Sequence, residues 1–291
     1  MARAYIIYNC KAGYDTNEEK IKSLTTSLTD EVSFFNISDI KDYASFFSAL
    51  NEDDYIVICG GDGTINCFVN DTADIKITNE ILYYPCGTGN DFATDLGHKK
   101  YDEPFSISNY IKDLPTVTVN GKVYRFINGI GYGIDGYCCE VGDIIKMQGE
   151  KKVNYTSIAI KGLLFHYKPT NAKILVDGVS YTFKNVWLAP TMNGRYYGGG
   201  MMPTPAQDRN DPEQKLSTLV FHGTGKLKTL MIFPSLFKVD HIKYTKYAKV
   251  LTGKEIKVEF DRPVALQIDG ETILGVTSYT ASSKAKIASL S

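Results

Sequence analysis

A carboxylate surrounded by glycines follows an apolar run in the first quarter of the chain. The stretch reads YIVICGGDGTIN and covers residues 55–66. Glycines at a strand end allow positive φ angles and let backbone N–H groups approach an anion, and a helix beginning near Thr64 would direct its dipole to the same place. Because Asp62 would repel a phosphate bound there, a Mg²⁺ ion between the carboxylate and a polyphosphate reconciles the two. The alternative is a tight strand-to-helix turn in which Asp62 caps the helix.

Two other loops have the same character. Residues 9–13 read NCKAG, and residues 85–92 read PCGTGNDF. Ligands of open α/β sheets bind outside the carboxyl ends of the strands, so three such loops favour a phosphate site over simple turns. The P-loop pattern is absent from the sequence. Residues 131–136 match G-x-G-x-x-G, but they lie outside the βαβ pattern and are better explained as a glycine-rich bend.

The elements that must position these loops alternate between strand and helix. Apolar runs predict strands over residues 4–8, 32–35, 55–59 and 81–84, and helical periodicity predicts helices over 18–28, 39–50 and from about 64. This alternation predicts an α/β domain with a mainly parallel sheet, covering residues 1–115.

After residue 115 the pattern becomes antiparallel. Asn120-Gly121 and Asp177-Gly178 join alternating runs and predict two hairpins, over 116–127 and 172–183. Further strands are expected over 216–222, 254–260 and 264–268, with a helix around 155–167. The sequence thus predicts a β-rich second domain over residues 116–291, and the tail from about 280 to 291 could pack back on the first domain.

The composition excludes several classes of protein. The 291 residues carry a formal net charge of −1, so no basic field would recruit nucleic acid. The six cysteines and four histidines show no zinc-binding spacing, and the chain begins with no secretory signal pattern. The apolar runs are shorter than the ~20 residues needed to span a bilayer. These features predict a reduced, cytoplasmic protein.

Five motifs in a fixed order carry a family resemblance. They are Gly60–Thr64 with Asn66, Pro85–Asp91, Asn128–Asp135, Gly198–Met201 and Gln267–Glu271. With them the sequence resembles the diacylglycerol kinase catalytic family, in its soluble bacterial lipid kinase branch, which is related to sphingosine kinases and NAD kinases.

The resemblance implies an N-terminal nucleotide-binding domain, a C-terminal antiparallel β-sandwich and catalysis in a cleft between them. It implies transfer of the γ-phosphoryl group of ATP, with Mg²⁺, to the hydroxyl of a lipid, namely diacylglycerol or a related lipid. Catalytic roles fall to Glu271 as general base, Asp269 beside it and Asp62, and the metal ligands would be Asp62 and Asp211. The implied nucleotide-binding residues are Asn9, Cys10, Lys11, Ala12, Gly13, Gly60, Gly61, Asp62, Gly63, Thr64, Ile65, Asn66, Cys67, Gly87, Thr88, Asn90 and Asp91.

The chain also departs from the family pattern. Cys10 and Ala12 stand where the family usually has Pro and Ser, and Cys67 stands where Glu is common. The D-G-x-L motif, where a structural magnesium binds in some bacterial members, is replaced by the longer stretch 208–216 around Asp211. Two alternatives therefore stay open: an NAD kinase-like enzyme for a soluble substrate, and a nucleotide-binding regulatory protein that has lost catalysis.

A lipid kinase must also reach its substrate. Residues 225–237 combine an apolar stretch with nearby lysines, which is consistent with peripheral contact at the inner membrane face. The same pattern fits a core helix with a solvated basic face. The expected partner is a lipid at the membrane surface rather than nucleic acid, and a homodimer is left open.

Overall fold

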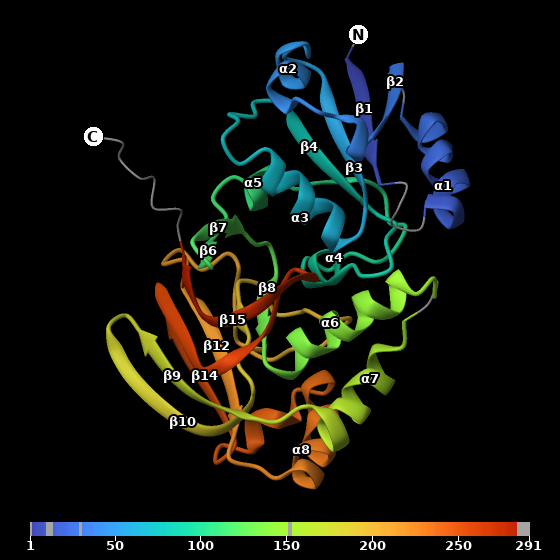
Figure 1. Ribbon diagram of the computed structural model, residues 1–291. Helices are drawn as coiled ribbons and strands as arrows, with labels where there is room; N and C mark the ends of the chain where they lie inside the picture. The colour runs from blue at the N-terminus through green and yellow to red at the C-terminus, as the bar shows by residue number, and fades with distance from the viewer. Residues whose placement is uncertain (1, 10–13, 29–30, 151–152, 284–291) are drawn as a thin grey trace. The chain divides into compact units, whose positions relative to one another are not determined.

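The chain forms two compact units that divide between Leu114 and Pro115, and each is described by itself (Figure 1). The computed structural model describes residues 2–9, 14–28, 31–150 and 153–283. Within these ranges no helix combines the length and the apolar character needed to cross a membrane. The predicted positions Cys10, Lys11, Ala12 and Gly13, and the tail from residue 284 onward, lie outside the described residues.

A mostly parallel sheet forms the centre of the first unit. Its strand order is β2-β1-β3-β4-β5, and only the β4–β5 pair is antiparallel. The strands are β1 (Arg3–Tyr8), β2 (Glu31–Asn36), β3 (Tyr55–Gly60), β4 (Glu80–Pro85) and β5 (Phe105–Ser106). The runs of buried residues in β1, β3 and β4 are typical of strands covered on both faces, and they confirm the predicted α/β domain.

Helices cover both faces of this sheet. They are α1 (Tyr14–Ser27), η1 (Ile37–Asp39), α2 (Tyr43–Ser48), α3 (Asp62–Asp71), α4 (Asp91–Asp95) and α5 (Ser108–Ile111). Ile21 and Leu24 of α1 pack into a cluster with Ile6 and Val57. The helix predicted over 39–50 is shorter in the structure, because Asp42 accepts hydrogen bonds from the N–H groups two and three residues later and so begins α2 at Tyr43.

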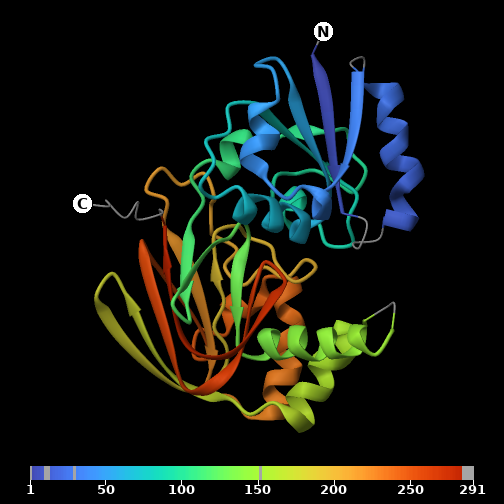
Figure 2. The same cartoon turned by 45° about the horizontal axis from the view of Figure 1, so that its top comes forward.

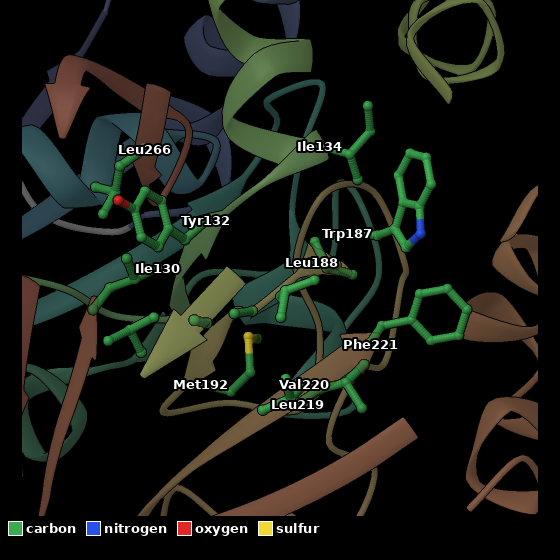
Figure 3. Close-up of a cluster of buried hydrophobic side chains, with 14 of the residues drawn as sticks. Ile130, Tyr132, Ile134, Trp187, Leu188, Met192, Leu219, Val220, Phe221 and Leu266 are labelled. Atoms are coloured by element: carbon green, nitrogen blue, oxygen red, sulfur yellow. The ribbon is translucent and has the colours of Figure 1, made fainter. Parts of the chain in front are cut away.

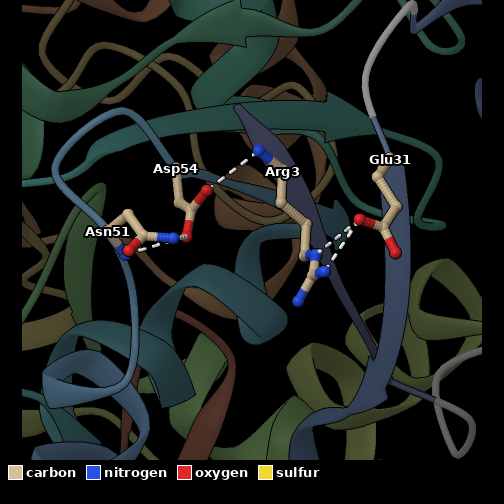
Figure 4. A network of polar contacts seen from close by, with 4 residues as sticks. All are labelled: Arg3, Glu31, Asn51 and Asp54. Carbon is tan, nitrogen blue, oxygen red and sulfur yellow. Dashed lines mark hydrogen bonds and ion pairs between the residues drawn. The ribbon is translucent and has the colours of Figure 1, made fainter. Parts of the chain in front are cut away.

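The edge of the sheet where the parallel strands begin is held by polar contacts. Asp54 accepts hydrogen bonds from the backbone N–H of Arg3 at 2.9 Å and of Asn51 at 2.8 Å (Figure 4). The Arg3 guanidinium pairs with Glu31 on the neighbouring strand at 2.7 Å. These contacts join β1, β2 and the turn before β3, so they set the alignment of the strands far from the glycine loops.

An antiparallel sheet dominates the second unit. Its strands are β6 (Thr116–Val119), β7 (Lys122–Arg125), β8 (Gly129–Tyr132), β9 (Thr170–Val176), β10 (Val179–Leu188), β11 (Thr191–Met192), β12 (Leu216–His222), β13 (Ala248–Gly253), β14 (Glu255–Ile268) and β15 (Glu271–Ser282). β14 pairs with β15, β8 and β9, so β9 at one end of the strand order also pairs with a strand in the middle of that order (Figure 2). The segments predicted as separate strands over 254–260 and 264–268 form this one long strand, whose pairing with β15 shifts register between Glu259 and Val264.

The helical segments that the structure describes in the second unit lie over the core of its sheet. They are α6 (Ile134–Met147), α7 (Tyr155–Lys161), η2 (Gly162–His166), α8 (Lys226–Ile232), η3 (Phe233–Phe237) and η4 (Asp240–Lys243). The core beneath them is rich in large side chains, among them Tyr132, Trp187 and Phe221 (Figure 3). The buried Trp187 indole donates to the carbonyl of Thr224 at 2.9 Å, so its one polar atom is satisfied.

The prediction of a simple bend over residues 131–136 was wrong, because this segment connects β8 to the helix α6. Gly133, with a φ of 114°, is the N-cap of that helix. A Cβ on Gly136 would lie 2.0 Å from the carbonyl oxygen of Ala265, so only glycine lets α6 approach β14 this closely. The glycines that suggested a bend instead allow α6 to pack closely on neighbouring backbone.

Candidate active site

The carboxyl ends of β1, β3 and β4 meet at one edge of the parallel sheet. β1 pairs with β3 up to Tyr8 opposite Cys59, and β3 pairs with β4 up to Gly60 opposite Pro85, so the strands end side by side. The chain leaves β1 toward β2 on one side and continues from β3 to β4 on the other, which makes the gap between β1 and β3 the topological switch point. Asn9, at the tip of β1, lies at this edge.

The loops after β3 and β4 are packed backbone against backbone. The N–H groups of Cys86 and Gly87 donate to the carbonyl of Gly60 at 3.0 and 2.8 Å. A Cβ on Gly87 would lie 2.3 Å from the Cα of Gly61, and a Cβ on Gly61 would lie 2.5 Å from the carbonyl oxygen of Gly89. The glycines are therefore required by the contact between the two loops, which act as one platform.

Asp62 joins the same two loops through its side chain. Its carboxylate accepts the N–H of Asp91 at 2.8 Å and of Phe92 at 2.9 Å, at the beginning of α4. The alternative that Asp62 caps its own helix was wrong, since Gly61 is the N-cap and Asp62 lies in the first turn of α3. The two bonds fix the direction of the carboxylate, while its role as a Mg²⁺ ligand stays a prediction.

Other predicted nucleotide-binding residues have visible local roles. Asn90 donates to the carbonyl of Gly87 at 2.9 Å and lies 3.1 Å from the hydroxyl of Tyr83, a residue that the sequence did not single out. Thr88 is exposed at the tip of the loop. The buried Thr64 hydroxyl finds no hydrogen-bond partner among the described residues. A buried hydroxyl without a partner is unfavourable, so Thr64 is a polar cost within this loop.

In the second unit the predicted hairpin tip is confirmed. Ile268 pairs with Glu271, and the two residues between them, Asp269 and Gly270, have φ angles of 47° and 98°. Glu271 is exposed at the first position of β15. The turn therefore presents this carboxylate to solvent, and its role as general base stays a prediction.

Asp269 is bound by the backbone at the beginning of β8. Its carboxylate accepts the N–H groups of Ile127 at 2.6 Å and of Asn128 and Gly129 at 2.9 Å each. Three N–H donors hold the tip at a fixed position on the sheet. This geometry supports a positioning role for Asp269.

Two further side chains hold the residues on either side of Glu271. Gln267 accepts the N–H of Gly270 at 2.6 Å, and the hydroxyl of Thr272 donates to Asp143 of α6 at 2.7 Å. Sequence reasoning included Gln267 in a motif without assigning it a role, and it missed Asp143 because α6 was not expected. The residues on either side of Glu271 are thus both held by hydrogen bonds.

Asp135 lies buried beneath this tip, in the first turn of α6. The hydroxyl of Tyr197 donates to it at 3.1 Å, and burial raises its pKa to about 6. A Cβ on Gly131 would lie 2.0 Å from the Asp135 carboxylate and 2.4 Å from the Gln267 amide nitrogen, so both side chains fill the space above this glycine. Gly131 therefore leaves room for both Asp135 and Gln267 beside β8.

Comparison with known proteins gives the identity of both halves. Residues 3–120 match the diacylglycerol kinase catalytic domain, and residues 128–286, more than half of the chain, match the YegS C-terminal NAD kinase beta sandwich-like domain. The chain belongs to the diacylglycerol kinase family whose members join these two domains. Membership of this kinase family supports a phosphotransferase activity and implies the use of ATP.

Individual relatives agree with this assignment. A protein named "Putative lipid kinase YtlR" from Bacillus subtilis strain 168 is 24% identical over 251 residues, which cover 78% of this chain and 77% of the relative. A "Putative lipid kinase" of Staphylococcus aureus strain Newman is 26% identical over 286 residues, covering 92% and 90%. The structure of a "putative diacylglycerol kinase" from Bacillus anthracis strain Sterne matches with a TM-score of 0.68 at 23% identity, covering 96% of this chain and 91% of that one, and supports the fold.

The buried carboxyl group of Asp135 should make the free energy of unfolding depend on pH. Asp135 has a pKa of about 6 in the folded chain and about 3.9 when unfolded, so the folded state holds the proton more tightly between these values. The free energy of unfolding therefore falls as the pH rises from the unfolded to the folded pKa of Asp135. Above the folded pKa the carboxyl is ionised, and the whole loss of stability is present. We expect Asp135→Asn to gain roughly 2–3 kcal/mol relative to the wild type between pH 4 and pH 8.

Urea unfolding at several pH values measures this difference. Asp53→Asn, the same change at an exposed side chain, is the matched control. A difference in unfolding free energy between Asp135→Asn and the wild type that does not vary with pH would show that the Asp135 carboxyl is not proton-linked to folding.

Asp211 lies in the turn-rich loop between Gln207 and β12. Its carboxylate accepts the N–H groups of Glu213 at 3.0 Å and of Lys215 at 3.3 Å. Among the residues that the structure describes, no three His, Cys, Asp or Glu side chains gather closely enough to hold a metal ion. The role of Asp211 as a metal ligand stays a prediction, while its carboxylate bonds hold the loop that contains it.

Proposed function

We propose that this protein is an ATP-dependent lipid kinase that transfers the γ-phosphoryl group to the hydroxyl of diacylglycerol or a related lipid. The observation that carries the proposal is the platform of glycine backbone at the sheet's switch point, with one oriented carboxylate, in a domain of the diacylglycerol kinase family. Open α/β sheets bind ligands at this edge, and glycine loops followed by helix N-termini suit phosphates.

The first unit would hold the nucleotide. The loop from Gly60 to Thr64 and the beginning of α3 would face the phosphates, with Asn9 at the tip of the neighbouring strand. The Asp62 carboxylate, whose direction is set by Asp91 and Phe92, suits a Mg²⁺ ion, which would supply positive charge to the polyphosphate. The chain's own contribution is to orient that carboxylate and to keep the loop rigid.

The second unit would orient the acceptor alcohol. An alcohol is too weakly acidic for Glu271 to deprotonate before the reaction, so Glu271 would position the hydroxyl and accept its proton late. The hydroxyl oxygen forms a bond to the γ-phosphorus as the bond to the β–γ bridging oxygen breaks, and ADP leaves. The location of this step in a cleft between the two domains stays a prediction.

One experiment separates the candidate acceptors. Purified protein with labelled ATP and Mg²⁺ is offered diacylglycerol, phosphatidylglycerol, sphingosine or NAD, and products are resolved by thin-layer chromatography. Labelled product from a lipid alone is the expected result. Product from NAD alone would favour the soluble-substrate enzyme, and nucleotide binding without any product would favour a regulatory protein.

A helical face of the second unit could meet the membrane. The exposed apolar side chains Ile160, Phe165, Leu227 and Met231, here called the α7–α8 face, are 43%, 71%, 72% and 74% accessible. Lys226 donates to the carbonyl of Leu164 at 2.8 Å, which places α8 beside η2. Apolar side chains flanked by exposed lysines are what an interfacial contact with anionic lipid requires. The proposal therefore includes reversible docking of this face on an anionic lipid surface.

Replacing both Leu227 and Met231 by serine should reduce binding to phosphatidylglycerol-containing vesicles by about tenfold, because less apolar surface enters the interface. Vesicle sedimentation measures the bound fraction, and pure phosphatidylcholine vesicles test the charge dependence. Val179→Ser, at another exposed apolar site of the second unit, is the control. Equal binding of wild type to neutral and anionic vesicles would contradict the docking proposal.

A further inference from the structure

A buried amide organises the loop that contains Asp211. Gln207 is 5% exposed, and its side-chain nitrogen donates to the carbonyl oxygen of Lys215 at 2.8 Å. The same nitrogen lies 3.3 Å from the carbonyl of Asn193 and 3.5 Å from that of Asp208. Carbonyl oxygens that converge on one point are typical ligands of a hard cation. Here the uncharged NH₂ group of Gln207 occupies that point.

The carboxylates of the loop are also engaged within it. Asp208 accepts the N–H of Asn210 at 2.9 Å, and Asp211 accepts the N–H groups of Glu213 and Lys215. The carbonyls of Asp208 and Asp211 accept further N–H groups at 3.1 and 2.8 Å. The loop is thus closed by its own hydrogen bonds around the Gln207 amide.

A fixed positive charge extends from this loop toward the hairpin tip. The Arg209 guanidinium donates to the carbonyl of Ile127 at 3.2 Å and to the side chain of Asn128 at 3.1 Å. The N–H groups of the same short segment hold the Asp269 carboxylate. Arg209 therefore supplies positive charge at the segment that anchors the acid-bearing turn.

We propose that Gln207 and Arg209 organise this part of the second unit in place of a bound divalent cation. The amide holds the carbonyl oxygens that a cation would otherwise bring together, and the guanidinium provides the charge. The residues do not fit the structural magnesium site that the family resemblance implied at Asp211. The second unit is therefore stable without divalent metal, and any need for Mg²⁺ comes from the nucleotide alone.

The first test uses the nucleotide-free, full-length wild type. Its melting temperature and its heat of titration with MgCl₂ are measured after EDTA treatment, with CaCl₂ and MnCl₂ in parallel. We expect no saturable binding and no shift in the melting temperature. A cation bound at a hundred times its Kd would raise the melting temperature by roughly 5–10 °C, and such a shift or one saturable equivalent of bound Mg²⁺ would overturn the proposal.

The second test converts the amide into a carboxylate. Gln207→Glu places a negative charge against three carbonyl oxygens, so the variant should melt several degrees lower in EDTA, and Mg²⁺ should recover part of that loss. Gln148→Glu makes the same change at an exposed position and should show neither effect. If Gln207→Glu melts at the wild-type temperature in EDTA, the amide is not the organising group and the proposal fails.

These measurements involve neither ATP turnover nor a lipid. Their failure would leave the proposed kinase function untouched, and failure of the kinase assay would leave them intact. If Gln207→Glu does not fold, the wild-type titration alone decides the matter.

Discussion

Glu271→Gln should lower kcat by about 10²–10⁴-fold and leave the Kd for ATP nearly unchanged. The neutral amide keeps the shape of the side chain and the hairpin, whose position depends on Asp269 and Gln267, but it cannot accept the proton of the acceptor alcohol. Steady-state kinetics with saturating lipid give kcat, and calorimetric titration with ATP gives the Kd.

Glu150→Gln, the same change at an exposed position of the second unit, is the matched control for this variant. Turnover close to that of the wild type in Glu271→Gln would mean that another group accepts the proton. An unchanged kcat with a weakened Kd for ATP would assign Glu271 to the nucleotide instead.

Asp62 should show two separable effects, because its carboxylate is tied to the backbone and is also the candidate metal ligand. Asp62→Ala leaves the N–H groups of Asp91 and Phe92 without their acceptor and should lower the unfolding free energy by roughly 2–4 kcal/mol. Asp62→Asn keeps one acceptor oxygen, so its stability loss should be smaller, while loss of the charge should weaken Mg²⁺-dependent ATP binding. Thermal unfolding and ATP titration at several Mg²⁺ concentrations measure the two effects.

The pair of variants distinguishes the two roles. A folded Asp62→Asn protein with the wild-type Mg²⁺ dependence would exclude the carboxylate as a metal ligand and leave its contact with α4 intact. A wild-type stability for Asp62→Ala would instead show that the bonds to α4 contribute little. Asp95→Asn is a poor control because Asp95 is buried, so Asp53→Asn serves as the exposed comparison in the first unit.

Local sequence features predicted much of the fold. Apolar runs located β1, β3 and β4, and the Asn-Gly and Asp-Gly pairs located the two hairpin turns, where Asn120 and Asp177 have φ angles of 49° and 48°. In both cases the residues that determine the element lie within it or next to it along the chain. Where it does not, prediction failed: α6 was missed, and its Gly136 packs against the backbone of Ala265, which is distant along the chain.

The same distinction applies to the site. The positions of Glu271 and of the Gly60–Thr64 loop follow from motifs that can be read along the chain. The partners of Asp62, 29 and 30 residues away, and the amide role of Gln207 depend on tertiary contacts. A carboxylate in a glycine loop therefore suggested a metal ligand, while its visible bonds are to backbone N–H groups that only the folded chain brings near.

The binding of Asp269 by three consecutive N–H groups also makes the integrity of the turn observable in solution. Ile127, Asn128 and Gly129 lie 142, 141 and 140 positions from Asp269 along the chain, so these amide protons become protected only when β8 and the end of β14 have come together. Their deuterium exchange rates should therefore report directly on opening of the turn that carries Glu271, without a substrate.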